Sequence, residues 1–133
     1  MKHFIDISDF TAKKLDLIIQ KAIKIKKNPN IFSNKCKNKT LGLIFQKEST
    51  RTIVSFAVGF QKLGGNFIEL NSDSIGIDKR ESAQDILKTL SQFIDLLVIR
   101  NNDHKLIKKL SCLNSLPIIN GLSDYSHPCQ ILS

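Results

Sequence analysis

The chain has 133 residues, 41% of them hydrophobic and 24% charged, an ordinary balance for one globular domain with one core. Its net charge of +8 indicates an anionic partner, such as nucleic acid, a membrane surface or a phosphorylated metabolite. The three cysteines lack Cys-x-x-Cys spacing, which argues against a disulfide framework or a metal site and predicts reduced thiols in the cytoplasm.

The first half of the chain predicts two helices around a buried strand. Ser8 or Asp9 is a suitable cap for a helix that ends at 28–30, and an apolar strand follows at 41–45. The second helix should run over 50–63 and stop at Gly64-Gly65. The apolar positions of these helices are Leu15, Ile18, Ile19, Ala22 and Ile23 in the first, and Ile53, Phe56, Phe60 and Leu63 in the second.

The second half repeats the alternation. A short strand at 66–70 precedes a polar loop at 71–80, and a helix starting at 81–82 should bury Ile86, Leu87, Leu90, Phe93 and Ile94. The remaining predicted elements are a strand at 96–99, a helix at 103–110, a strand at 116–119, a turn at Asn120-Gly121 and a helix starting at His127-Pro128.

This order predicts the α/β class, a three-layer domain with a central four-stranded parallel sheet flanked by helices. The strands are continuously apolar, as expected when helices cover both faces of the sheet. Ligands of such sheets bind outside the carboxyl ends of the strands. We therefore expect the polar residues that follow the four strands to lie along one rim.

The chemistry expected at that rim is recognition of a phosphorylated acyl compound. Ser49, Thr50 and Thr52 stand with Arg51 at the start of a helix, where N–H groups and the helix dipole favour an anion. Arg51 and Arg100 could clamp a dianion, and no metal is required because the arginines supply positive charge. His127 could stabilise negative charge developing on a carbonyl oxygen, and Gln130 could orient an amide.

Each of these residues also has a simpler interpretation. Ser49–Thr52 is also explained as a capped helix start with an exposed arginine, and Arg100 as part of a surface ion pair. His127 is also a suitable turn or cap residue, and Gln130 alone carries little information. The interpretation as an anion site rests on all of these residues following strands of the same sheet.

Nucleic acid and membrane are not the partners we expect. The lysines concentrate at 13–39 and 105–109, away from the predicted rim, and we interpret them as solvated surface. Tyr125 is the only tyrosine and there is no tryptophan, so stacking platforms for bases are missing. The N-terminus lacks the apolar run of a signal peptide, and no apolar stretch is long enough to span a bilayer.

The sequence resembles the transcarbamylase family, the aspartate and ornithine carbamoyltransferases, in motifs that keep the family order across nearly the whole chain. The segment 120–124 and Cys129 are similar to the ornithine branch. The matching pieces are Phe45…Ser49-Thr50-Arg51-Thr52…Ser55-Phe56, Gly64-Gly65, Glu81-Ser82…Asp85, Arg100, and Pro117…Asn120-Gly121-Leu122-Ser123-Asp124…His127-Pro128-Cys129-Gln130.

The resemblance implies a carbamoyl-phosphate-binding domain that uses no cofactor. The segment 49–52 would hold the phosphate with help from Arg100, while Thr52, Arg100 and His127 would polarise the carbamoyl oxygen. Gln130 would contact the carbamoyl nitrogen. The δ-amine of ornithine would then attack the carbonyl carbon, giving citrulline and phosphate.

Other implied features depart from the family pattern or concern its assembly. Ile53 and Ala57 replace an arginine and a glutamate that the family usually carries, a concerted exchange of two residues four apart on a helix. The loop at 72–80 is longer than usual; in the family it reaches a neighbouring subunit of a homotrimer, a role for Lys79 or Arg80. Glu81 resembles the acid that steadies the phosphate-binding arginine, here Arg51.

Residues 1–133 correspond to the first domain of the family, and the second domain, which binds ornithine, lies outside the sequence. We therefore expect an exposed apolar patch and poor turnover by this chain alone. Three alternatives remain: transfer to aspartate or another amino acid, a non-catalytic phosphate-binding or assembly module, and nucleic-acid binding through the lysines.

Overall fold

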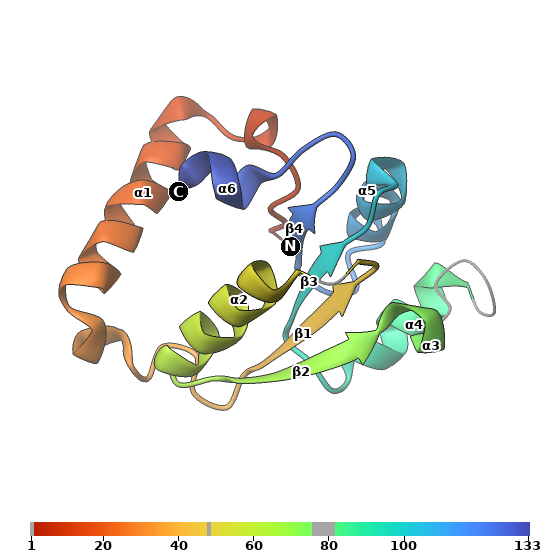
Figure 1. Cartoon of the computed structure of the whole chain (residues 1–133), viewed down its shortest axis with the longest axis horizontal. Coiled ribbons are helices and arrows are strands. Elements are labelled where there is room, and N and C mark those ends of the chain that lie inside the picture. The colour runs from red at the N-terminus through yellow and green to blue at the C-terminus, as the bar shows by residue number, and fades with distance from the viewer. Residues whose placement is uncertain (1, 48, 76–81) are drawn as a thin grey trace.

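The computed structural model describes residues 2–47, 49–75 and 82–133, and it is organised around one parallel sheet (Figure 1). The strands are β1 (Thr40–Phe45), β2 (Asn66–Asn71), β3 (Leu96–Arg100) and β4 (Ile118–Leu122). They lie in the order β2-β1-β3-β4, and each neighbouring pair is parallel. The predicted four-stranded parallel sheet is confirmed.

The helices fall between the strands, as the alternating pattern predicts. The α-helices are α1 (Ala12–Lys27), α2 (Thr50–Lys62), α3 (Ser72–Ile75), α4 (Ala83–Ser91), α5 (His104–Cys112) and α6 (Pro128–Leu132), and two short 3-10 helices are η1 (Ile7–Asp9) and η2 (Pro29–Phe32).

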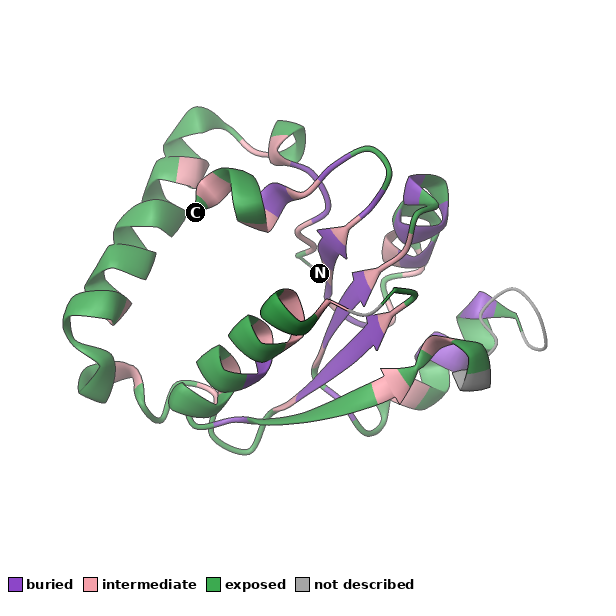
Figure 2. Ribbon diagram, in the orientation of Figure 1, coloured by how far each residue is buried: buried purple, intermediate pink, exposed green. Residues whose placement is uncertain are grey.

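Alternation of side chains along the strands creates two cores, one on each face of the sheet. Leu43 and Val98 lie in the core covered by α2, together with partly buried side chains of that helix. Ile44 and Ile99 point to the opposite face, where α4 and α5 supply buried leucines and isoleucines. Burial is accordingly concentrated on β1, β3 and β4, between these helices (Figure 2). The three-layer prediction is confirmed.

Helix α1 has no buried residue, in contrast to α2, α4, α5 and α6. Its predicted apolar face is present, yet Ile18, Ile19 and Ile23 remain 38%, 36% and 41% exposed. Figure 2 shows the helix almost entirely in the exposed colour. The apolar patch expected from the sequence therefore lies on α1.

Two local predictions in the helices are wrong. The first helix is capped by Thr11, whose hydroxyl accepts the Lys14 N–H at 3.2 Å, and not by Ser8 or Asp9, which belong to η1. Phe93 is 74% exposed instead of buried. Helix α4 ends at Ser91, before Phe93 is reached. The helical spacing that predicted burial of Phe93 therefore does not apply to it.

The predicted loop at 71–80 and the predicted turn at Asn120-Gly121 also need correction. Asn71 is the last residue of β2, the short helix α3 follows it, and residues 76–80 lie outside the described residues. Asn120-Gly121 lies inside β4. Segment 4–6 runs beside this strand: the Phe4 N–H donates to Ile118 O and the Asn120 N–H to Phe4 O, both at 2.8 Å. This pairing along the edge of β4 keeps the Asn-Gly pair extended.

The end of α2 depends on one glycine, as the sequence predicts. Gly64 follows the last residues of the helix with a φ of +92°, and its N–H donates to Gln61 O at 2.9 Å. A side chain at this position would meet the Ser33 carbonyl oxygen. Gly59, in the middle of the same helix, has no atom within 4 Å of the position of a Cβ.

We predict that Gly64→Ala lowers the free energy of unfolding by about 1–3 kcal/mol, because alanine is strained at positive φ and its Cβ contacts the Ser33 backbone. Gly59→Ala is the matched control and should be neutral or stabilising by up to about 1 kcal/mol, since alanine favours a helix interior. Urea denaturation of both variants measures the difference. Equal stabilities would contradict this account of the helix end.

Candidate functional site

The site lies where the carboxyl ends of β1 and β3 meet. Phe45 at the end of β1 pairs with Arg100 at the end of β3, and the Gln46 N–H donates to Arg100 O at 2.9 Å. The Gln46 side-chain oxygen accepts the Asn102 N–H at 3.0 Å, which joins the segments that follow the two strands. The helix after β1 covers one face and the helix after β3 the other, the arrangement in which α/β sheets bind ligands beside the strand ends.

Helix α2 starts beyond the end of β1, and its first turn carries the predicted hydroxyls. Ser49 is the N-cap residue, but its side chain accepts no capping hydrogen bond. Instead, Ser49 Oγ donates to Thr52 Oγ1 at 3.0 Å. The first backbone N–H groups of a helix have no partner within it, so this end of α2 can donate to an anion.

A cavity of about 490 Å³ lies between the starts of α2 and α6. Residues far apart in the sequence meet there. The cavity is lined by Arg51, Thr52, Ser55, Phe56, His127, Cys129, Gln130 and Ser133. Four predicted site residues, Arg51, Thr52, His127 and Gln130, are thus brought together from two helices.

The other predicted residues do not line this cavity, and some of them fall outside the described residues. Ser49 reaches it through its bond to Thr52, and Thr50 is the exposed first residue of α2. Arg100 is half-exposed at the end of β3, and its charge acts on His127. Lys79, Arg80 and Glu81, predicted to contact a neighbouring subunit or Arg51, lie outside the described residues.

The surroundings of His127 favour its neutral form. Burial of the imidazole lowers its pKa below the ordinary value of 6.5, and the positive charge of Arg100 lowers that pKa further. Its Nδ1 atom is buried and has no hydrogen-bond partner among the described residues. A neutral imidazole has one N–H to donate, which suits a carbonyl oxygen.

Cys129 lines the same cavity but is a poor nucleophile. Burial raises the pKa of its thiol to about 11, so the reactive thiolate is scarce at neutral pH. The chemistry available to the cavity is therefore hydrogen bonding and electrostatic stabilisation by cations and N–H or O–H donors.

Within the described ranges, no group of three or more His, Cys, Asp or Glu side chains is arranged to hold a metal ion.

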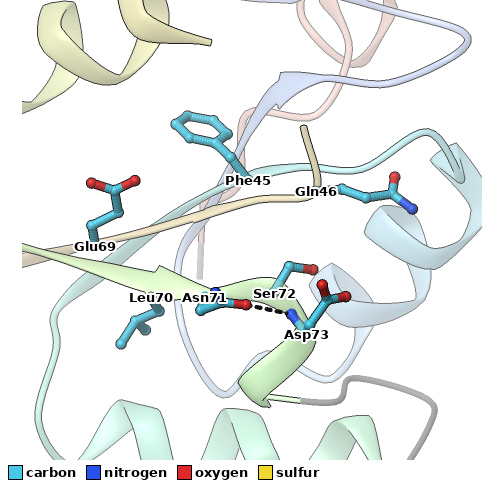
Figure 3. A pocket seen from close by; sticks show the side chains of 7 residues that line it. All are labelled: Phe45, Gln46, Glu69, Leu70, Asn71, Ser72 and Asp73. Atoms are coloured by element: carbon cyan, nitrogen blue, oxygen red, sulfur yellow. Dashed lines mark hydrogen bonds between the residues drawn. The ribbon is translucent and has the colours of Figure 1, made fainter. Parts of the chain in front are cut away.

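A second cavity, of about 420 Å³, lies beside the ends of β1 and β2 (Figure 3). Gln46, Glu69 and Asp73 are among its lining residues, and the Asn71 side-chain oxygen accepts the Asp73 N–H at 2.9 Å. Two carboxylates make this cavity unsuitable for a phosphate, because like charges repel. The cavity that contains Arg51 is therefore the better candidate for an anion site.

The sequence did not predict the structural role of three polar residues before His127, although Asn120 and Ser123 stand in the motif that resembles the transcarbamylase family. Asn120 is fully buried, and Ser123 and Ser126 are 7% and 8% exposed in the segment that leads from β4 to His127. Three polar residues in one short segment were the available signal, but their partners lie elsewhere in the chain.

Separately, no helix in the described part of the protein is long and apolar enough to cross a bilayer.

Comparison with known proteins gives one consistent family. Residues 2–133 match the family model described as aspartate/ornithine carbamoyltransferase, carbamoyl-P binding domain. The ornithine carbamoyltransferase of Aquifex aeolicus is 38% identical over 132 residues, which cover 99% of this chain and 43% of that protein. That of Methanococcus aeolicus is 39% identical over 131 residues, covering 98% and 43%.

Solved structures give the same result. The ornithine carbamoyltransferase from Pyrococcus furiosus superposes with a TM-score of 0.92 at 38% identity, covering 98% of this chain and 42% of that one. The enzyme from Thermus thermophilus superposes with a TM-score of 0.89 at 31% identity, covering 99% and 46%. The chain thus spans less than half the length of these relatives.

We predict that Arg100→Gln raises the pKa of His127, because the cation that disfavours the imidazolium is removed. The pKa should stay below the ordinary 6.5, since burial is the larger cause of its depression. NMR titration of the imidazole signals measures it. Lys62→Gln, at the far end of α2, removes the same charge as a control, and an equal shift in both variants would rule out a local effect of Arg100.

Proposed function

The chain belongs to the aspartate/ornithine carbamoyltransferase family, and on that premise we propose that it supplies the carbamoyl-phosphate site of an enzyme that carbamoylates ornithine. The observation that carries this proposal is the cavity shared by Arg51, Thr52, His127 and Gln130. It combines the donors that a phosphate and a carbamoyl group each require. The proposed products are citrulline and phosphate.

The phosphate half of the proposed site is the start of α2. Arg51 offers a planar guanidinium that suits a phosphate, and the unpartnered first-turn N–H groups add donors without further charge. Ser49 and Thr50 contribute hydroxyls at the same turn. Arg100 adds a second cation from the end of β3, close enough to act on His127. A dianion is favoured by this set of groups.

The acyl half of the proposed site consists of Thr52 in α2 and of His127 and Gln130 at α6. His127 and Thr52 would donate to the carbamoyl oxygen, with the Arg100 charge nearby, and Gln130 would accept from the carbamoyl nitrogen. The neutral δ-amine of ornithine attacks the carbonyl carbon and the carbonyl oxygen becomes negative. The bond from carbon to the phosphate oxygen then breaks, and the departing phosphate takes the proton that the attacking nitrogen loses. Catalysis comes from positioning and from stabilising that negative oxygen. The high pKa of Cys129 supports a route without a covalent enzyme intermediate.

Ornithine as the acceptor, the assembly and the compartment are parts of the same proposal. The names of the relatives and the segment 120–124 support ornithine over aspartate. We propose a homotrimer for the whole protein by resemblance to the family. Cys36, Cys112 and Cys129 are free thiols in the structure, which supports a cytoplasmic location.

Isothermal titration with carbamoyl phosphate tests the site directly. The chain should bind it, and Arg51→Ala should weaken binding about tenfold or more, because a charge-assisted hydrogen bond contributes about 1.5–3 kcal/mol. Lys62→Ala, which removes a cation from the other end of the same helix, should bind as the unchanged chain does.

Absence of binding by the chain, or equal binding by Arg51→Ala, would overturn the site assignment. Inorganic phosphate is a useful second ligand in the same titration. If it binds as tightly as carbamoyl phosphate, the cavity recognises only phosphate, and the proposed contacts to the carbamoyl group are wrong.

A further inference from the structure

The segment that joins β4 to His127 is fastened by a histidine from another helix. His104, at the start of α5, is only 9% exposed, and its Nδ1 lies 2.7 Å from Ser123 Oγ. The backbone N–H of His104 donates to the Asp124 carboxylate at 3.3 Å. The ring of Tyr125 packs against the His104 ring, with 4.9 Å between centroids. Three consecutive residues of the segment therefore contact His104.

Ser123 passes this constraint to the residue before His127. Its hydroxyl oxygen accepts the N–H of Ser126 at 3.0 Å and that of Tyr125 at 3.3 Å, which closes a tight turn over 123–126. Ser126 is also held from the other side. Its hydroxyl donates to Asp6 Oδ1 at 3.2 Å, and its carbonyl accepts from the Asn120 side chain at 3.2 Å.

The same turn is bonded to the segment that follows Arg100. The Asn101 N–H donates to Leu122 O at 3.2 Å, and the Asp124 N–H donates to Asn102 O at 3.1 Å. A displacement of residues 123–126 would therefore be felt at both His127 and Arg100. His104 contacts this turn but does not line the cavity that contains Arg51.

Of the two ring nitrogens of His104, Nδ1 makes the contact with Ser123. Nε2 is buried and has no hydrogen-bond partner among the described residues. An unpaired polar atom in the interior is costly, so packing alone favours an apolar side chain here. Retaining an imidazole at that cost is understandable if the bond from Nδ1 to Ser123 has a purpose of its own.

We propose that His104 is a positioning residue that orients His127 by holding the turn 123–126 through Ser123. The proposal rests on the proposed function only in that His127 contacts the carbamoyl group. The positioning itself is a property of the protein without ligand. His104 does not touch the substrate, and its effect passes entirely through the backbone of the turn.

Two substitutions of His104 distinguish the roles of its two ring nitrogens. The side-chain amide of asparagine reaches the place of Nδ1, and that of glutamine reaches the place of Nε2. His104→Asn should therefore keep the bond to Ser123, whereas His104→Gln should lose it. Both variants disturb packing, so a loss of thermal stability is expected in each and does not discriminate between them.

The discriminating measurements are the NMR titration of His127 in the full chain and the affinity for carbamoyl phosphate. His104→Gln should shift the pKa of His127 measured in this titration. It should also weaken carbamoyl phosphate binding about fivefold to tenfold, the effect of losing one ordinary hydrogen bond. His104→Asn should leave both close to those of the unchanged chain. Ser123→Ala should reproduce the pKa shift seen in His104→Gln.

Equal behaviour of the asparagine and glutamine variants, or an unchanged His127 titration in both His104→Gln and Ser123→Ala, would overturn the proposal. If His104→Gln fails to fold, His104→Asn decides alone, because a displaced His127 titration in it contradicts the proposal. If the unchanged chain binds no carbamoyl phosphate, the proposed function fails, and the His127 titration still decides the role of His104.

Discussion

The candidate site depends on the parallel pairing of β1 with β3. This pairing sets Phe45 beside Arg100 and allows Gln46 to bond both to Arg100 and to Asn102. The two strands continue into helices on opposite faces of the sheet (Figure 1). In such sheets ligands bind beside the strand ends where this switch occurs. A shift in the pairing of β1 with β3 would displace the start of α2 from Arg100, because α2 follows β1 and Arg100 ends β3.

Electrostatics gives the candidate site two different kinds of donor. Arg51 and Arg100 carry full charges, while burial and Arg100 itself favour the neutral form of His127. A third cation would add repulsion among the site's own groups, whereas a neutral imidazole can still donate one hydrogen bond. In the proposed function Arg100 would contribute twice: it would attract an anion, and it lowers the pKa of His127, which favours the uncharged imidazole whose N–H suits a carbonyl oxygen.

Most of the fold could be predicted from the sequence because it depends on local patterns. Apolar runs such as 41–45 mark buried strands, and spacings of three and four mark the helices that cover them. The errors come from long-range structure. Asn120-Gly121 is an ordinary turn pair, yet segment 4–6 lies more than a hundred residues away in the sequence and keeps it extended in β4. No local pattern carries that information.

The two halves of the site differ in the same way. The proposed phosphate half, Ser49–Thr52, is one continuous segment, and its geometry follows from a helix start that the sequence predicts. The acyl half depends on distant partners. Leu122 has a φ of +145°, a strained conformation for a residue with a side chain. Bonds from Asn120 to Ile5 and from Ser126 to Asp6 surround this strained residue, and the His104 bond completes the turn that follows it. Since these partners come from the first residues, α5 and β4, substitutions far from the cavity can reach His127 while leaving the start of α2 unchanged.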